Sequence, residues 1–202
     1  MGLISNGTTI FDNGAMASGF GGSMTFISSQ TASASASISF TTGIDSTYKE
    51  YVFYFVNLHA SSSGAVCGFN LSTDGGANYN VTKTTTAFRA YHAESGATAA
   101  LGYSPGEDLA QSTADQLITV FGASTNNDAC WSGKFNLFNP SSTTYVKHFI
   151  SITQHNRDTP QYSDNFYVAG YLNTTSAINA IKFQMNTGTM DDGKIKMYGI
   201  KA

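Results

Sequence analysis

Hydrophobic and polar residues alternate along much of this chain, and the alternation is most regular near its end. The apolar positions there are Ile178, Ile181, Phe183, Met185, Ile195 and Met197, and the polar or amphipathic positions between them are Lys182, Gln184, Lys194, Lys196 and Tyr198. A period of two residues is the pattern of a strand with one buried face. Asp191-Asp192-Gly193 lies between the two runs and supplies the positive-φ residue that a hairpin turn needs. We therefore predict that residues 175–201 form a closing hairpin of two strands.

Similar runs, separated mostly by turn residues, predict further strands upstream. They span residues 24–28, 35–40, 48–59, 66–73, 85–92, 116–121, 130–138, 144–154 and 165–172. Many short strands with turns between them are typical of two packed antiparallel sheets. No repeat of fixed period is visible, which argues against a propeller or a β-helix. The sequence therefore predicts an all-β fold, an antiparallel two-sheet β-sandwich.

The run 48–59 is the strongest candidate for a central strand. Its two faces carry Val52, Tyr54, Val56 and Leu58 on one side and Tyr51, Phe53 and Phe55 on the other. Because both sets are apolar, we expect both faces of this strand to be covered by protein. The one helix that the pattern suggests is a short one over residues 106–115, directly after Pro105.

Residues 1–23 differ in composition from the rest of the chain. They are rich in Gly, Ser and Asn, and their isolated apolar residues include Leu3, Ile4, Ile10 and Phe11. Without sustained alternation this segment cannot bury itself, so it is either a frayed terminus or an extended arm that becomes ordered against a neighbouring subunit. We expect a short N-terminal arm over residues 1–23 and one β-sandwich domain over residues 24–202.

Charge and composition exclude some classes of partner. Charged residues make up only 11% of the chain, the net charge is −3, and Arg89 and Arg157 are the only arginines. A nucleic-acid-binding protein has a basic footprint, which is missing here. The N-terminus lacks the basic and apolar regions of a signal peptide, and no apolar run reaches the length of a membrane span. We therefore expect synthesis in a cytoplasm, no nucleic acid and no membrane insertion.

The segment from Ser72 to Tyr79 approximates an Asp-box, Ser-x-Asp-x-Gly-x-x-aromatic. In such a segment the Asp74 side chain accepts hydrogen bonds from turn amides, and the glycines permit positive φ. Asp74, Asn78 and Asn80 also offer oxygens that suit Ca²⁺, but the spacing lacks the bidentate Glu of an EF-hand loop. We expect a structural turn and leave calcium open.

Sites for catalysis or for other metals are not evident. The four histidines, His59, His92, His148 and His155, and the two cysteines, Cys67 and Cys130, show no closely spaced zinc-ligand pattern. The cysteines can pair if their strands are neighbours, although free thiols are the expectation for a chain made in a reducing compartment. No nucleophile elbow, phosphate-binding loop or dinucleotide fingerprint occurs. We expect neither an enzyme nor a cofactor.

Two segments combine aromatic rings, a cation and polar side chains, which suits contact with a sugar or a protein. They cover residues 89–103 and 154–162, and their candidate contact residues are Arg89, Tyr91, His92, Tyr103, His155, Arg157 and Tyr162. The alternative interpretation of these segments is that of ordinary exposed loops.

The ending, an Ile-x-x-Ile-x-Phe strand, a Gly-containing turn and a strand closing on Tyr-Gly-Ile, resembles small all-β virion proteins of tailed bacteriophages. The Ser72–Tyr79 turn and the strand HFISIT at 148–153 strengthen the resemblance. It implies a jelly-roll-like sandwich, a homotrimer, no cofactor, and a position on the virion surface next to other virion proteins. Leu3, Ile4, Ile10 and Phe11 would then belong to a docking arm.

The leading hypothesis is a non-enzymatic tail fibre or tail-tip component that contacts a host surface glycan or protein. A capsid decoration protein is the alternative, and a carbohydrate-binding β-sandwich module is the second alternative. The absence of a collagen-like or coiled-coil shaft favours decoration, whereas the aromatic and amide-rich loops favour a receptor-facing role.

Overall fold

The computed structural model describes residues 3–12, 15–16, 23–120, 124–157 and 161–201, and these form fifteen strands. The N-terminal strands are β1 (Leu3–Ser5), β2 (Thr8–Asp12) and β3 (Ala15–Met16). The body contains β4 (Met24–Thr31), β5 (Ser37–Phe40), β6 (Glu50–Ala60), β7 (Cys67–Ser72), β8 (Lys83–Ala93), β9 (Ala99–Tyr103), β10 (Gln116–Leu117), β11 (Trp131–Phe138), β12 (Lys147–Arg157), β13 (Tyr162–Leu172), β14 (Ala180–Met185) and β15 (Met190–Ile200).

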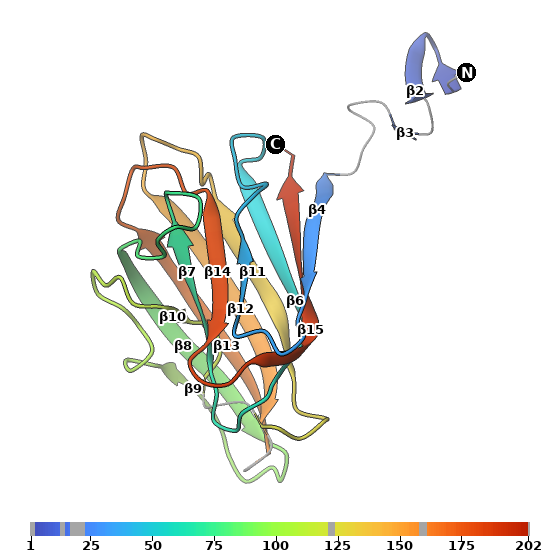
Figure 1. The fold of residues 1–202 in the computed structure, drawn as a ribbon. Helices are drawn as coiled ribbons and strands as arrows, with labels where there is room; N and C mark the ends of the chain where they lie inside the picture. Colours follow the sequence, from blue (N-terminus) through green and yellow to red (C-terminus); the bar gives the residue numbers. More distant parts are fainter. Residues whose placement is uncertain (1–2, 13–14, 17–22, 121–123, 158–160, 202) are drawn as a thin grey trace.

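Two antiparallel sheets make the body (Figure 1). The large sheet has eight strands in the order β4-β15-β6-β11-β12-β13-β8-β9, and the small sheet has four in the order β10-β7-β14-β5. The predicted all-β, two-sheet antiparallel sandwich is therefore confirmed. Eight strands against four are compatible with a jelly-roll-like arrangement that carries additional strands on one layer.

The core is a layer of phenylalanine rings between the sheets. Phe53 and Phe55 on β6 meet Phe183 on β14, with ring centroids 5.6 and 5.1 Å apart. On the neighbouring strands, Phe69 of β7 packs edge-to-face on Phe135 of β11 at 4.6 Å. All five side chains are at most 2% exposed. Edge-to-face packing adds about 0.5–1.5 kcal/mol per ring pair beyond the burial of apolar area.

The predicted closing hairpin is wrong in its pairing, although its strand phase is confirmed. Phe183 and Ile195 are fully buried, yet β14 pairs with β5 and β7 in the small sheet whereas β15 pairs with β4 and β6 in the large one. The chain therefore crosses between the layers over residues 186–189. Gly193 does have a positive φ of 105°, but it lies within β15 at a register shift opposite Leu58, not in a turn.

The predicted helix over residues 106–115 is also wrong. This segment runs beside the start of β8, where the backbone N–H of Thr85 donates to the carbonyl of Leu109 and Lys83 exchanges two backbone bonds with Ser112. The segment forms no helix because its backbone groups make hydrogen bonds with β8 instead of with one another. The sequence pattern also missed β9, which pairs with the far end of β8.

The two faces of β6 differ more than the sequence predicts. Phe53 and Phe55 point into the core, but on the opposite face Val56 is 39% exposed and Tyr54 is half-buried. Asn57 takes a positive φ of 47°, and the resulting irregularity returns Leu58 to the buried side. Val52, on the same outer face, is only 3% exposed, so the expectation of cover on both faces is confirmed at that position and wrong at Val56, which lies on the outside of the large sheet.

Strands β1, β2 and β3 form a small antiparallel sheet beyond the start of β4, outside the sandwich (Figure 1). Asn6 and Gly7 both have positive φ, as in a type I′ hairpin, so the expected extended arm is in its described part a hairpin-based sheet. Ile4 is 61% exposed. The side chains of Leu3, Ile10 and Phe11 lie outside the described part of the structure.

Candidate functional site

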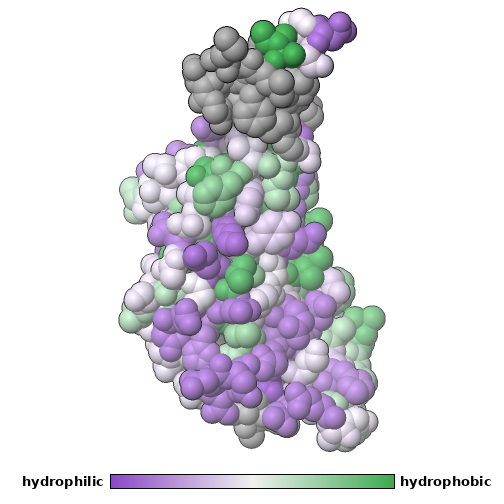
Figure 2. All heavy atoms as spheres, turned by 90° about the vertical axis from the view of Figure 1, so that its right-hand side faces the viewer, coloured by the Kyte–Doolittle hydropathy of each residue, from purple (hydrophilic) through white to green (hydrophobic). Residues whose placement is uncertain are grey.

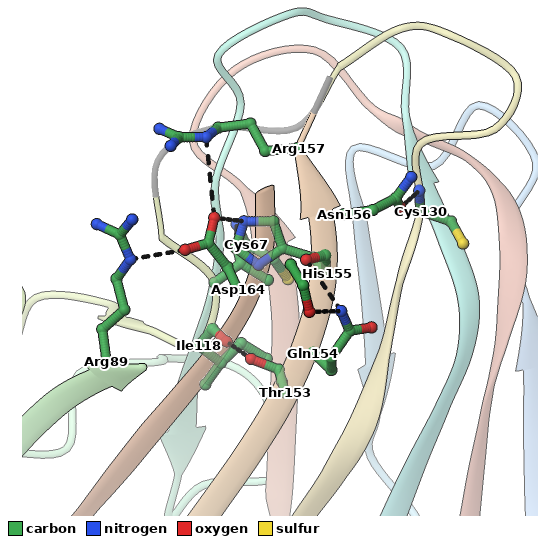
Figure 3. Close-up of polar contacts among 12 residues, drawn as sticks. Cys67, Arg89, Ile118, Cys130, Thr153, Gln154, His155, Asn156, Arg157 and Asp164 are labelled. Carbon is green, nitrogen blue, oxygen red and sulfur yellow. Dashed lines mark hydrogen bonds and ion pairs between the residues drawn. The ribbon is translucent and has the colours of Figure 1, made fainter. Parts of the chain in front are cut away.

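Three of the predicted contact residues lie around one buried carboxylate at one end of the large sheet (Figure 3). Asp164 of β13 is fully buried because it occupies an inward position of that strand. Its Oδ1 lies 2.6 Å from Arg89 Nε on β8, and its Oδ2 lies 3.6 Å from His155 Nε2 and 3.8 Å from Arg157 Nε on β12. The neighbouring strands β12, β13 and β8 thus meet at one charge cluster.

Tyrosine rings cover the two arginines of this cluster. The Arg89 guanidinium lies 4.0 Å from the ring centre of Tyr91, and that of Arg157 lies 4.3 Å from the ring centre of Tyr162. The two rings meet edge-to-face with their centroids 5.5 Å apart. Five of the seven predicted contact residues are therefore brought together around Asp164.

The two remaining predicted contact residues lie elsewhere. His92 is exposed on β8, opposite Ser163 in the sheet register. Tyr103 lies on β9, directly opposite Phe88, and its hydroxyl donates to the carboxylate of Asp108. Both are accessible, but neither belongs to the Asp164 cluster.

Of the three residues that lie around the Asp164 carboxylate, His155 is the most deeply buried. The residue is 3% exposed, and burial lowers the pKa of its imidazole; the nearby arginines lower that pKa further and Asp164 opposes them. The ring is therefore neutral in the folded protein at neutral pH. Asp164 was missed at the sequence level, although the alternation of its strand signals it, since Asp164 shares the inward parity of Phe166 and Val168.

The Asp-box turn is braced by its own side chains. Asp74 Oδ1 accepts hydrogen bonds from the Ser72 hydroxyl at 2.6 Å and the Asn78 backbone N–H at 2.9 Å, while Oδ2 accepts from Asn78 Nδ2 at 2.7 Å. These bonds lower the pKa of Asp74 to about 2. Both carboxylate oxygens are thus engaged within the turn, as the structural interpretation predicts.

A second polar region lies beside the register shift of β15. His59 Nδ1 is 2.6 Å from Asp191 Oδ1, and His59 Nε2 is 3.0 Å from the Asn126 carbonyl. Burial lowers the pKa of His59, but these two hydrogen bonds and the charges of Asp191 and Asp192 outweigh it and raise the pKa above 6.5. The pair borders an open hollow of about 490 Å³ that Cys130 also lines.

Both cysteines are free, as expected from the sequence. Cys67 is buried in β7, where burial raises the pKa of its thiol, and Cys130 is half-buried just before β11. Figure 3 shows the two side chains well separated. Burial also raises the pKa of the Cys130 thiol, so this residue lacks the thiolate character of a nucleophile.

Within the described ranges, no three His, Cys, Asp or Glu side chains are grouped so that they could hold a metal ion. The same part of the chain contains no helix with the length and apolar character needed to cross a membrane.

The outer face of the large sheet carries most of the exposed aromatic residues. One row across seven strands consists of Lys196, Tyr54, Lys134, Ile152, Tyr167, Phe88 and Tyr103. Within it, the rings of Phe88 and Tyr167 stack in parallel with centroids 4.6 Å apart. Phe26, on the edge strand β4, is 55% exposed and packs edge-to-face on Tyr198. On the side shown in Figure 2, hydrophobic residues form small separate patches among hydrophilic ones.

Comparison with known proteins adds little to this picture. No family model matches the sequence, and no curated protein matches it. A solved structure of a protein of unknown function from Bacteroides ovatus is similar over 52% of this chain and 45% of its own, with 8% identity and a TM-score of 0.28. A likeness this weak carries no argument about fold or function.

Proposed function

We propose that this protein is a non-enzymatic structural component of a tailed bacteriophage particle, exposed on the virion as part of a tail fibre or tail tip that contacts the host. It is made in the host cytoplasm and assembles as a homotrimer next to other virion proteins. The observation that carries the proposal is the division of the chain into a sandwich and a separate N-terminal sheet. Among the described residues, the hydrophobic core and the side chains packed against it begin at Ile27.

This division suits a protein that is held at one end and presents the other. The sheet of β1–β3 leaves Ile4 61% exposed, and a segment of this size cannot bury an apolar side chain alone. A neighbouring virion protein would cover it. The few charges of the chain lower the desolvation cost of such subunit contacts.

The alternative is a capsid decoration protein, in which the same arm fastens the sandwich to the shell. Gold-labelled antibodies against residues 24–202 distinguish the two positions on particles from a lysing culture that produces the protein. Label at the tail supports the proposal, and label over the capsid supports the alternative. If purified particles carry no label while the soluble fraction contains the protein, the virion assignment is wrong.

A further inference from the structure

A shallow hollow of about 450 Å³ lies on the outer face of the large sheet, over β11, β12, β13 and β8. The outward-facing side chains around it are Phe138, His148, Tyr171, Thr84, Ile150 and Thr86, and Ala169 lies between them. Phe138, His148, Tyr171 and Thr84 stand directly opposite one another, one from each strand. The hollow therefore has a regular row of side chains along one border, and its volume falls in the range of small-molecule sites.

The depth of the hollow comes from a small residue. Ala169 lies between Tyr167 and Tyr171 on the outer face of β13, and its neighbours across the sheet are Ile150 and Thr86. A larger side chain at position 169 would stand level with the two tyrosines and fill the space. The sequence thus leaves a gap between two aromatic side chains of one strand.

The border is held in place by Gln111, which has a positive φ of 48°. Its Nε2 donates to Thr84 Oγ1 at 2.6 Å and to the Tyr171 hydroxyl at 3.1 Å, and its Oε1 accepts from Asn173 Nδ2 at 2.6 Å. A non-glycine residue in the left-handed region costs conformational energy, which the surrounding contacts must offset. Because Gln111 is hydrogen-bonded to the hydroxyls of both Tyr171 and Thr84, the Tyr171 ring and the Thr84 hydroxyl are positioned before any ligand arrives.

The chemistry of the lining favours an uncharged ligand that is apolar on its faces and rich in hydroxyls. Phe138 and Tyr171 offer rings, while Thr84 and Thr86 offer hydroxyls and His148 an imidazole. The lining contains no Lys, Arg, Asp or Glu, so a charged ligand would find no counter-charge there. Sugar rings combine C–H faces with hydroxyls, and they match this set.

A second copy of the chain fits this face less well. Lys134 and Lys196 lie on the same face, two rows from the row of Phe138 and Thr84, on either side of Tyr54. In a two-fold interface each patch meets itself, so these lysines would approach like charges and lose hydration. Charge thus argues against a two-fold interface through this face, and in a trimer interface, which is not two-fold, the lysines would still lose hydration on burial.

We infer that the hollow between Phe138, Tyr171 and Thr86 binds a neutral oligosaccharide. This inference rests on the proposed host contact and names both its ligand class and its site. The site lies on the outer face of the sheet and is distinct from the Asp164 cluster.

Calorimetric titration of the full-length protein with short oligomers of glucose, galactose, mannose and N-acetylglucosamine tests the inference. We expect the native protein to bind at least one of them. Ala169→Leu, which fills the hollow, and Tyr171→Ala, which removes a ring, should each weaken that binding about tenfold or more. Tyr198→Ala, an aromatic deletion on the same face but outside the hollow, is the matched control and should leave binding unchanged.

Failure to bind any of these oligomers overturns the inference, as does binding that Ala169→Leu leaves unchanged. A change in the solution mass of Ala169→Leu would make the hollow an interface between copies and would also overturn it. If Tyr171→Ala does not fold, Ala169→Leu with the Tyr198→Ala control still decides. Antibody labelling of particles is independent of these titrations, so the virion proposal and the glycan inference can fail separately.

Discussion

Phe183 contacts the large sheet at the centre of the core. It is fully buried, and its ring meets those of Phe53, Phe55 and Phe135. Phe183→Ala should lower the free energy of unfolding by about 3–5 kcal/mol, because it removes buried apolar area and leaves a cavity. Urea denaturation measures this loss. Lys182→Ala, the neighbouring outward position, should cost about 1 kcal/mol or less, and equal stability of the two variants would refute the strand phase.

Two histidines should give stability opposite dependences on pH. Burial lowers the pKa of His155 below 6.5, so the unfolded chain binds more protons below about pH 6.5 and stability falls as the pH falls. The contribution of His155 is at most about 1.4 kcal/mol per pH unit. The pKa of His59 is raised, so its stabilising contribution is present below pH 6.5 and is lost as the pH rises through the folded value.

Urea unfolding over a series of pH values on both sides of 6.5 separates these effects. His155→Gln should reduce the pH dependence of the free energy of unfolding below pH 6.5, and His59→Gln should reduce it above pH 6.5. An acid slope that persists in His155→Gln would show that another group carries it.

At the scale of single elements, the register shift of β15 depends on Gly193. Its φ is +105°, and a Cβ there would lie 2.5 Å from the Asn57 carbonyl oxygen and 2.6 Å from Leu58 Cα. Gly193→Ala should therefore cost about 1–3 kcal/mol, from backbone strain and from the clash. Thermal unfolding at matched conditions measures the loss. Gly102→Ala in β9 has open space around the added methyl and is the control; no difference between the two would contradict the role assigned to Gly193.

The elements show which parts of this fold a sequence can predict. Alternation correctly predicts the buried face of β14 and of β15, because burial of Phe183 and Ile195 is a local property of each strand. The partners of each strand, in contrast, depend on distant parts of the chain. The same alternating pattern would be found if β14 and β15 paired with each other in a hairpin or if they lay in two facing sheets. Gly193 was correctly expected to have a positive φ, but turns and register shifts place the same demand on glycine. The dipeptide Asn6-Gly7 is typical of a type I′ hairpin turn, so the pairing of β1 with β2 could have been predicted from the sequence but was not.

For the candidate sites, too, the sequence predicts local features but not the contacts that strand pairing creates. Arg89, Tyr91 and Arg157 were singled out from their types and sequence neighbours, and the structure brings them together. The common partner of the two arginines, Asp164, lies far from Arg89 in sequence, and only the pairing of β8 with β13 brings these two residues close. The hollow over β11, β12, β13 and β8 could not be predicted at all, since its row of side chains comes from four strands whose register depends on the whole sheet.

At the scale of the whole molecule, the two sheets share one core and the N-terminal sheet stands outside it. The body over residues 24–202 contains all described core residues, so it should fold when residues 1–23 are absent. In this account the sandwich forms the trimer and the N-terminal sheet attaches it to the particle. Assembly and attachment should therefore depend on different parts of the chain.

The mass of the protein in solution tests this account most directly. Light scattering on the full-length protein should give three times the chain mass of 21.4 kDa, and a variant lacking residues 1–23 should also be a trimer. A monomer in both forms would contradict the trimer. A trimer that dissociates when residues 1–23 are removed would contradict the assignment of that segment to attachment and would favour the capsid decoration alternative.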